Sequence, residues 1–225
     1  SVAAIERALE RRRSRLDGEA ALSSGTHPDQ LDLETLLEGG DDQDDLAATL
    51  SASTPREFFA YERGLLDELL AATRVVRQDD EKLRMLLEEV VEPLWEQGKK
   101  LLIFTEYRAT QEYLQAALQE RFPAAGEVLL INGSMSLDEK LATIHAFNEG
   151  ASSFLISTEA GGEGLNLHRA CHVMVNYDLP WNPARLVQRI GRLYRYGQDQ
   201  KVIVFNLHAR DSFDNAAVDL MLTRL

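Results

Sequence analysis

Eleven residues near the C-terminal end of the sequence, Gln188–Gln198, carry its strongest chemical signal. They read Gln-Arg-Ile-Gly-Arg-Leu-Tyr-Arg-Tyr-Gly-Gln. A helix would place Gln188, Arg192 and Arg195 on one face, because they are spaced i, i+4, i+7. Guanidinium groups stabilise the charge on a phosphoryl group during its transfer, and one such arginine is worth about 10³–10⁵ in rate. The run therefore predicts phosphate chemistry, and its structural alternative is a solvated basic helix.

The distribution of charge along the chain supports the same prediction. The 225 residues include 24 lysines and arginines and 37 aspartates and glutamates, and the net charge of -13 by itself argues against a nucleic-acid partner. Residues 1–95, however, hold 11 of the basic and 22 of the acidic residues. Between residues 169 and 201 there are six basic residues and only two acidic ones, Asp178 and Asp199. The acidity thus belongs to the N-terminal part, and the arginines gather where the motif lies.

Alternating strands and helices are predicted from Lys99 onward. Apolar runs predict strands at 101–104, 127–131, 153–157, 172–177 and 202–206, and helices at 108–121, at 137–147 and from Asn182 to about Tyr196. Such alternation indicates βαβ units, and hence an α/β fold whose parallel sheet has helices on both faces. Functional loops are then expected beyond the carboxyl ends of the strands.

Residues 1–95 are predicted to be mainly helical. Helices are expected at 1–22, at 31–37, from Thr54 onward and from Asp79 to Gly98, with a flexible acidic loop near 39–53. In the first helix, Ile5, Leu9 and Leu16 are expected to share a face, with Arg11–Arg13 solvated. The apolar stripe predicted to face the core further on consists of Phe58, Tyr61, Leu65, Leu69 and Val76. The predicted domains are therefore 1–95 and 96–225.

Several functional classes are excluded by composition. The segment Ser1–Glu6 lacks the basic stretch and apolar core of a signal peptide, and no apolar run approaches the ~20 residues of a membrane span. A single cysteine, Cys171, excludes an intrachain disulfide and fits a reducing compartment. His168 and His172 lie near it, but no second cysteine accompanies them, so no metal site is expected. We expect a cytoplasmic protein without a membrane partner.

Further segments match a known motor family in order and spacing. Gln188–Gln198 resembles motif VI of superfamily-two helicases in its SWI/SNF-like form. Residues 157–167 look like motif V, 177–183 like the link between these two motifs, 102–107 like motif IV and 131–135 like the strand-end motif that follows it. The resemblance covers residues 80–208 and is closest to bacterial RapA-like translocases. It implies the RecA-like second motor lobe, preceded by a helical interlobe region at 1–95.

The resemblance also implies roles for individual residues. Arg192 and Arg195 would be arginine fingers that reach ATP bound on a partner lobe, and Gln188 would help to organise the cleft. Gly164 and Asn166 would approach the nucleotide sugar or the cleft. The residues implied to contact nucleic acid are Thr105, Gly133, Thr158, Gly161, Gly162 and Trp181. Taken alone, the glycine pair could also be a tight turn, Trp181 a hydrophobic staple and Thr105 a helix cap.

In this family the first lobe carries the Gly-Lys-Thr/Ser loop and the Asp-Glu-x-His motif, which hold the phosphates and Mg²⁺. Neither motif occurs in the 225 residues: Gly98-Lys99-Lys100 lacks the hydroxyl residue, and Asp80-Glu81-Lys82 falls in a predicted helix. We therefore expect the sequence to be a C-terminal portion that hydrolyses no ATP alone. ATP and Mg²⁺ are the expected cofactors, both bound mainly by the missing lobe.

The function implied by the resemblance is ATP-driven tracking along double-stranded DNA, with remodelling of protein–DNA complexes. The implied partners are the N-terminal RecA-like lobe of the same protein, double-stranded DNA, and RNA polymerase or a defence or repair complex at the nucleoid. Two alternatives stay open. An RNA-directed helicase is disfavoured by the link Asp178–Pro183, and a non-catalytic docking module is disfavoured by the intact Gln188, Arg192 and Arg195.

Overall fold

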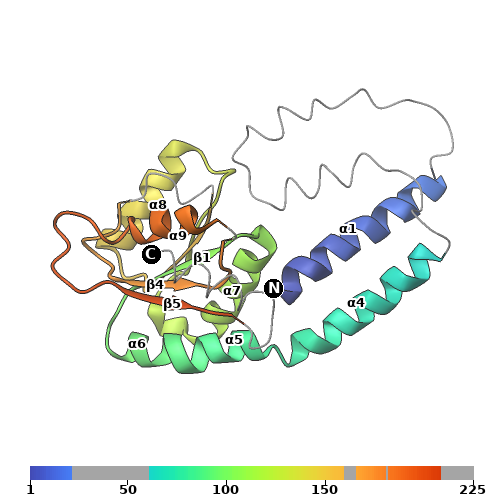
Figure 1. The fold of residues 1–225 in the computed structure, drawn as a ribbon, viewed down its shortest axis with the longest axis horizontal. Coiled ribbons are helices and arrows are strands. Elements are labelled where there is room, and N and C mark those ends of the chain that lie inside the picture. Colours follow the sequence, from blue (N-terminus) through green and yellow to red (C-terminus); the bar gives the residue numbers. More distant parts are fainter. Residues whose placement is uncertain (22–60, 160–165, 181, 209–225) are drawn as a thin grey trace. The chain divides into compact units, whose positions relative to one another are not determined.

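A computed structural model describes residues 1–21, 61–159, 166–180 and 182–208 (Figure 1). The chain divides into two compact units, residues 1–80 and 81–225. Among the described helices, none combines the length and apolar content that a membrane crossing requires. The predicted helix at 31–37, the helix start at Thr54 and the acidic loop near 39–53 lie outside the described residues.

The second unit is built on a five-stranded parallel sheet with the strand order β2-β3-β1-β4-β5. Its strands are β1 (Leu101–Thr105), β2 (Leu129–Ile131), β3 (Phe154–Thr158), β4 (Val173–Asn176) and β5 (Ile203–Asn206). All five lie at predicted strands, and β1, β3 and β4 are buried throughout. Burial on both faces explains why their sequences are continuous apolar runs instead of alternating ones. The α/β fold with a parallel sheet is thus confirmed.

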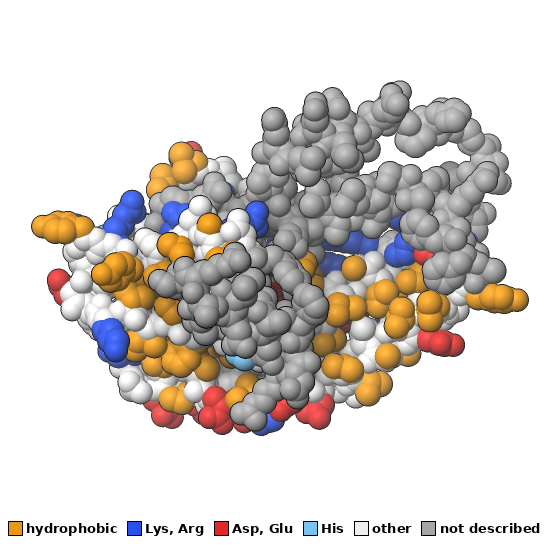
Figure 2. All heavy atoms as spheres, viewed as in Figure 1, with side chains coloured by type: hydrophobic (Ala, Val, Ile, Leu, Met, Phe, Trp, Pro, Cys, Tyr) orange, Lys and Arg blue, Asp and Glu red, His pale blue; other side chains and the backbone are white. Residues whose placement is uncertain are grey.

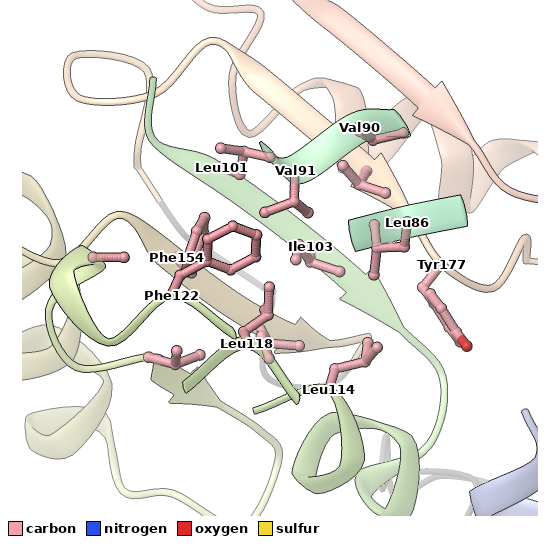
Figure 3. Packing of buried hydrophobic residues seen from close by; sticks show 14 of the residues in the cluster. Leu86, Val90, Val91, Leu101, Ile103, Leu114, Leu118, Phe122, Phe154 and Tyr177 are labelled. Carbon is pink, nitrogen blue, oxygen red and sulfur yellow. The ribbon is translucent and has the colours of Figure 1, made fainter. Parts of the chain in front are cut away.

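One face of the sheet is covered by α7 (Arg108–Arg121) and by the helical stretch that precedes β1. Leu101 and Ile103 of β1 point to this face, where Leu114 and Leu118 of α7 pack against them (Figure 3). Phe122 follows α7 and meets Phe154 of β3 edge-on, with 5.6 Å between the ring centroids. Each of these side chains is at most 3% exposed, so the layer is a closed apolar core.

The opposite face is covered by α8 (Leu137–Glu149) and α9 (Pro183–Ile190) (Figure 1). Leu102 and Phe104 alternate with the β1 residues of the other face, as the pleat of a strand requires. Phe147 of α8 and Leu193, which follows α9, are both fully buried in this second layer. Helices on both faces were predicted from the strand–helix alternation, and the two clusters confirm them.

The helical stretch before β1 runs from α5 (Glu81–Met85) through a π-helical turn, η1 (Leu86–Val91), to α6 (Glu92–Glu96). Leu86, Val90 and Val91 are buried against the sheet (Figure 3). The left-handed residue Gly98, with φ of 69°, follows the stretch as expected for a helix stop. Because this stretch packs on the sheet, the boundary between the two compact units lies between Asp80 and Glu81. The boundary predicted from the sequence was after residue 95.

The first unit contains α1 (Val2–Ala21) and α4 (Glu62–Gln78), which pack against each other. Two expectations about their faces were wrong. Ile5 is 54% exposed although Leu16 is buried, and the predicted core stripe on α4 is exposed at Tyr61, Leu65, Leu69 and Val76. The face that α4 buries carries Glu62, Leu66 and Leu70 instead.

Arginines explain why α4 buries that face. Arg12 of α1 donates to both carboxylate oxygens of Glu62, at 2.8 and 3.0 Å. Arg13 donates to Asp67 at 2.8 Å, and Arg77 of α4 donates to Glu6 at 2.6 Å. The predicted solvation of Arg11–Arg13 is therefore wrong for Arg12 and Arg13. The ion pairs between the helices, and not the apolar stripe, determine which face of α4 is buried.

Candidate functional site

The carboxyl ends of the strands meet at the point where the sheet topology reverses. β1 and β4 are neighbours, but α7 leads from β1 towards β2 while α9 leads from β4 towards β5, on the other face. In parallel α/β sheets a crevice for ligands opens at such a point. Thr105 ends β1 at this position, and Asp178 follows β4. The topology therefore predicts a ligand site near these two residues.

Thr105 and Asp178 are joined directly. The Thr105 hydroxyl donates to Asp178 Oδ2 at 2.5 Å, and Lys82 Nζ approaches the other carboxylate oxygen at 3.4 Å. Thr105 is fully buried, and in the strand register it lies beside Thr158, also fully buried. Tyr107 is the N-cap residue of α7, and its amide donates to the Thr105 hydroxyl oxygen at 3.4 Å, so Thr105 contacts the start of the helix without occupying the cap position. Two of the predicted nucleic-acid contacts thus stand side by side at the strand ends.

Arg189 of α9 occupies the centre of this region. Its Nε and Nη2 donate to Glu159 Oε2 at 2.8 and 2.6 Å, and its Nη1 donates to Asn176 Oδ1 at 3.0 Å and to the Asp178 carbonyl at 2.8 Å. The guanidinium also lies over the Phe104 ring, 5.1 Å from its centroid. With 1% exposure, Arg189 is a fully bonded interior cation.

Glu106 follows Thr105 and is buried beside the same cation. Burial raises the pKa of its carboxyl group, which is 5% exposed. Arg189 and Arg185 act in the opposite direction, while the nearby charges of Asp178 and Glu159 raise the pKa further. The strand-end cluster is defined as Thr105, Glu106, Glu159, Asn176, Asp178 and Arg189. It therefore combines three charged groups held by hydrogen bonds, Glu159, Asp178 and Arg189, with a carboxyl group whose pKa is raised by burial.

The helix that carries the arginine motif is shorter than predicted. Asn182 caps α9, its Oδ1 accepting from the Ala184 amide at 2.9 Å, and Pro183 takes the first helical position. The helix ends at Ile190, not near Tyr196, because Gly191 is a poor helix former and the chain continues in tight turns. In the first of these turns the Arg192 amide donates to the Arg189 carbonyl at 3.0 Å.

This early end corrects the predicted common face of Gln188, Arg192 and Arg195. Gln188 belongs to α9 and is exposed, whereas Arg192 is half-buried and Arg195 exposed in the turns that follow. None of the three side chains forms a hydrogen bond or ion pair with the described residues. Arg192 and Arg195 thus differ from Arg189 and from the paired arginines of α1 and α4, because their side-chain donors have no acceptor among the described residues.

The loop that displays Arg195 is fixed from below. Gln198 Nε2 donates to the carbonyls of His168, Cys171 and Leu193 at 2.7, 3.1 and 3.4 Å. Gly197 adopts a φ of 94°, and a Cβ there would stand 3.3 Å from His168 Nε2. Both motif residues are therefore required by the shape of the turn, a role that spacing alone did not reveal.

A pocket of about 580 Å³ opens beside this loop. It is lined by Tyr194–Gln198 and by Gln200–Val202. Tyr194 and Tyr196 are 75% and 101% exposed. Figure 2 shows hydrophobic and basic side chains gathered at the left edge, where Figure 1 draws the loop between α9 and β5. The pocket thus presents aromatic and cationic groups together.

Other predicted site residues lie at the same edge of the sheet. Asn132 follows β2, and its Nδ2 donates to Gln111 Oε1 at 3.2 Å. Gln111, buried on α7, donates in turn to the carbonyls of Ile131 and Ile156 at 2.9 Å each. Gly133 stands next to this anchored residue and is half-buried. Asn166 Oδ1 lies 2.5 Å from His168 Nδ1, which links Asn166 to the loop at Gly197.

Four predicted residues lie outside the described ranges, namely Gly161, Gly162, Gly164 and Trp181. Within the described ranges, no group of three or more His, Cys, Asp or Glu side chains could hold a metal ion. Cys171 is buried and donates to the carbonyls of Lys100 and Val173 at 3.1 Å, and burial raises the pKa of its thiol to about 12. It packs as a neutral side chain.

The residues that the sequence analysis passed over are mainly the buried polar ones: Arg189, Glu159, Asp178, Glu106 and Gln198. A signal did exist in the sequence, because Glu106, Glu159 and Asp178 all follow predicted strands by one or two positions. What the sequence could not reveal is that one arginine of the motif turns inward while the next two do not.

Comparison with known proteins matches this architecture. The helicase conserved C-terminal domain family matches residues 81–197, more than half of the chain. The chain is 40% identical over 137 residues to the uncharacterized ATP-dependent helicase YqhH of Bacillus subtilis, covering 61% of this chain and 24% of that protein. It is 38% identical over 125 residues to the RNA polymerase-associated protein RapA of Vibrio parahaemolyticus, covering 56% of this chain and 12% of that protein.

Among solved structures, the C-terminal part of the Fun30 ATPase domain has a TM-score of 0.50 and 21% identity, covering 86% of this chain and 55% of that one. This likeness concerns the fold alone. The chain spans at most a quarter of the length of the two curated relatives. By its matched domain, its relatives and its parallel sheet, the chain belongs to the helicase conserved C-terminal domain family and forms the RecA-like second lobe of SWI/SNF-type superfamily-two helicases.

Proposed function

We propose that this chain is the second motor lobe of an ATP-dependent double-stranded DNA translocase that remodels protein–DNA complexes. The observation that carries the proposal is that the arginines of the motif differ in their contacts. Arg189 is consumed by interior bonds, whereas Arg192 and Arg195 form no hydrogen bond or ion pair with described residues. Their positions match the two arginine fingers of the family, and an arginine without a carboxylate partner suits a phosphoryl group.

ATP would be held between this lobe and another one. The 225 residues contain no Gly-Lys-Thr/Ser loop, so the phosphates and Mg²⁺ are proposed to bind mainly to the N-terminal RecA-like lobe. The guanidiniums of Arg192 and Arg195, which have no partner among the described residues, would meet the phosphate end of that nucleotide. Gln188 would organise the cleft, and Gly164 and Asn166 would meet the sugar or the cleft. The chemistry that bound ATP supplies is phosphoryl transfer to water.

The nucleic acid would run along the strand ends. Thr105, Thr158 and Gly133 lie at the carboxyl ends of β1, β3 and β2, and they are proposed to contact its backbone together with Gly161, Gly162 and Trp181. Phosphate contacts of this kind position a duplex without reading its sequence. A motor that moves along any sequence needs contacts of that type.

Partners and location are proposed from the same family relationship. The name of the Vibrio relative associates that protein with RNA polymerase, so RNA polymerase is one candidate partner here, beside a defence or repair complex. The protein would act in the cytoplasm at the nucleoid. The helical region between the lobes, predicted at 1–95, would then comprise the first unit, residues 1–80.

The polymer that stimulates ATP hydrolysis tests the proposal. In the full-length protein, duplex DNA should raise kcat for ATP, and duplex RNA of equal length should not. The 225-residue chain alone should hydrolyse no ATP with either polymer. Stimulation by RNA alone would replace the proposal with an RNA-directed helicase. ATPase activity of the chain alone that Arg192→Ala abolishes would overturn the shared active site.

A further inference from the structure

Arg189 differs from the other arginines of its segment in what it contacts. Arg192 and Arg195 form no hydrogen bond or ion pair with described residues, while Arg189 uses Nε, Nη1 and Nη2 within the strand-end cluster. It is also the largest of the fully buried side chains in the described part of the chain. A cation is costly to bury unless every donor finds an acceptor. Each of the three guanidinium nitrogens of Arg189 forms at least one hydrogen bond, and this arrangement calls for a functional explanation.

The bonds of Arg189 join three strands to one helix. Glu159 follows β3, Asn176 ends β4, and Phe104, whose ring lies under the guanidinium, belongs to β1. α9 supplies Arg189 itself. A shift of Glu159 or Asn176 must therefore move α9 or break a charge-assisted hydrogen bond.

A continuous chain of hydrogen bonds extends the link in both directions. On one side, the Asp178 carbonyl accepts from Arg189 while the Asp178 carboxylate accepts from Thr105. On the other side, the Arg189 carbonyl accepts from the Arg192 amide at 3.0 Å. Thr105 is thereby connected to Arg192 through two intermediate residues. One end belongs to the proposed nucleic-acid contacts and the other to the proposed contacts with ATP.

We propose that Arg189 is a positioning residue that couples the strand-end cluster to the turn carrying Arg192 and Arg195. The inference rests on the proposed function, since it assigns a ligand to each end of the hydrogen-bond chain. Contact of a duplex at the ends of β1 and β3, where the buried Thr105 and Thr158 lie, would fix Asp178 and Glu159. Arg189 would then hold the Arg192 turn in the position that stabilises phosphoryl transfer.

Lysine is the informative replacement at this position. Arg189→Lys keeps the positive charge, but a single ammonium group cannot reproduce the planar fork that reaches Glu159, Asn176 and the Asp178 carbonyl together. In the full-length protein with saturating duplex DNA, we expect kcat for ATP to fall about tenfold or more, because small displacements of a catalytic group have effects of this size. KM for ATP and Kd for DNA should stay within about twofold, since neither ligand touches Arg189.

The assay must separate positioning from a purely structural role. All variants are therefore measured well below their own melting temperatures, where each is fully folded. Arg121→Lys is the matched control, because Arg121 pairs with Glu92 on the surface through a 3.2 Å contact and should behave as wild type. Glu159→Gln is the second variant: it keeps the shape of the side chain, removes its charge, and should lower kcat in the same selective way.

The possible outcomes are distinct. A selective loss of kcat in Arg189→Lys and Glu159→Gln supports the coupling. The coupling is overturned if folded Arg189→Lys keeps the wild-type kcat. It is also overturned if kcat falls while KM for ATP and Kd for DNA rise by a similar factor. If wild-type protein shows no stimulation by duplex DNA, the proposed function fails first, and the coupling fails with it.

Discussion

At the residue scale, the arginines of this protein differ in what surrounds each guanidinium. Arg12 and Arg189 are almost fully covered and bonded to carboxylates. Arg192 and Arg195 lie only a few residues from Arg189, yet their donors have no partner among the described residues. Residue type alone therefore does not identify a phosphate-binding arginine. Among the described residues, Arg192 and Arg195 differ from the interior Arg189 in forming no side-chain hydrogen bond or ion pair, and it is their place in the motif that makes them the proposed fingers.

Glu106 provides a pH-dependent prediction at this scale. Because burial raises the pKa of its carboxyl above the ordinary value of 4.5, the folded chain keeps this proton to higher pH than the unfolded chain does. The stability associated with Glu106 is thus fully present below about pH 4.5 and is lost as pH rises through the folded pKa. Glu106→Gln, which mimics the neutral acid, should remove that loss.

Urea unfolding of wild type and Glu106→Gln at about pH 4 and about pH 8 measures the effect. The variant should gain stability relative to wild type as the pH rises. The charges that face Glu106 are those of Arg189, Arg185, Asp178 and Glu159, and they are the same in both proteins. A stability difference that does not change with pH would contradict the assignment.

At the scale of elements, the loop between α9 and β5 determines where Arg195 is displayed. Gly197→Ala should destabilise the chain by ~1–2 kcal/mol, because an L side chain is strained at a φ of 94° and its Cβ would meet His168. Gly64→Ala is the matched control on α4, where nothing lies within 4 Å of the added Cβ. It should stabilise the chain by ~0.5–1 kcal/mol.

Denaturant midpoints of the two alanine variants test this pair. We expect the midpoint to fall in Gly197→Ala and to rise in Gly64→Ala. If Gly197→Ala were as stable as wild type, the left-handed turn would not determine the conformation of the loop.

The strands were predictable from the sequence for a simple reason. A parallel strand that is buried on both faces is a continuous apolar run, and Leu101–Phe104 or Phe154–Ile156 cannot be mistaken for a surface segment. The helix predicted at 108–121 has the bounds of α7. The motif order then placed the candidate residues near the carboxyl ends of the strands.

The remainder could not be read from the sequence because it depends on tertiary contacts. Apolar spacing on α4 favoured Leu65 and Leu69 as core, yet ion pairs with α1 turn Glu62 and Leu66 inward. Helical spacing carried α9 through Gly191, where the structure ends it. The inward direction of Arg189 depends on Glu159 and Asn176, which lie 30 and 13 residues away in the chain.

At the scale of the whole molecule, the first unit relies on charges that span its two helices. The Arg12–Glu62 pair is buried, with side-chain exposures of 11% and 7%, whereas in the Arg13–Asp67 pair they are 26% and 58%. Glu62→Ala removes the carboxylate that accepts two hydrogen bonds from the buried Arg12 guanidinium and should destabilise the α1–α4 pair by ~3–5 kcal/mol. Asp67→Ala should cost only ~0–1 kcal/mol, because the exposed pair is screened by water.

Amide hydrogen exchange of α1 in the full chain distinguishes the two variants. Exchange should accelerate strongly in Glu62→Ala and little in Asp67→Ala. Equal acceleration would mean that burial does not set the strength of these pairs.

We propose that Arg192 acts on a nucleotide held by another lobe. This role is tested by measuring kcat for ATP in the full-length protein with duplex DNA, for wild type, Arg192→Ala and the surface control Arg121→Ala. We expect Arg192→Ala to lower kcat by about 10³-fold or more with ATP affinity nearly unchanged, and Arg121→Ala to match wild type. A kcat within about twofold of wild type in Arg192→Ala would contradict the account.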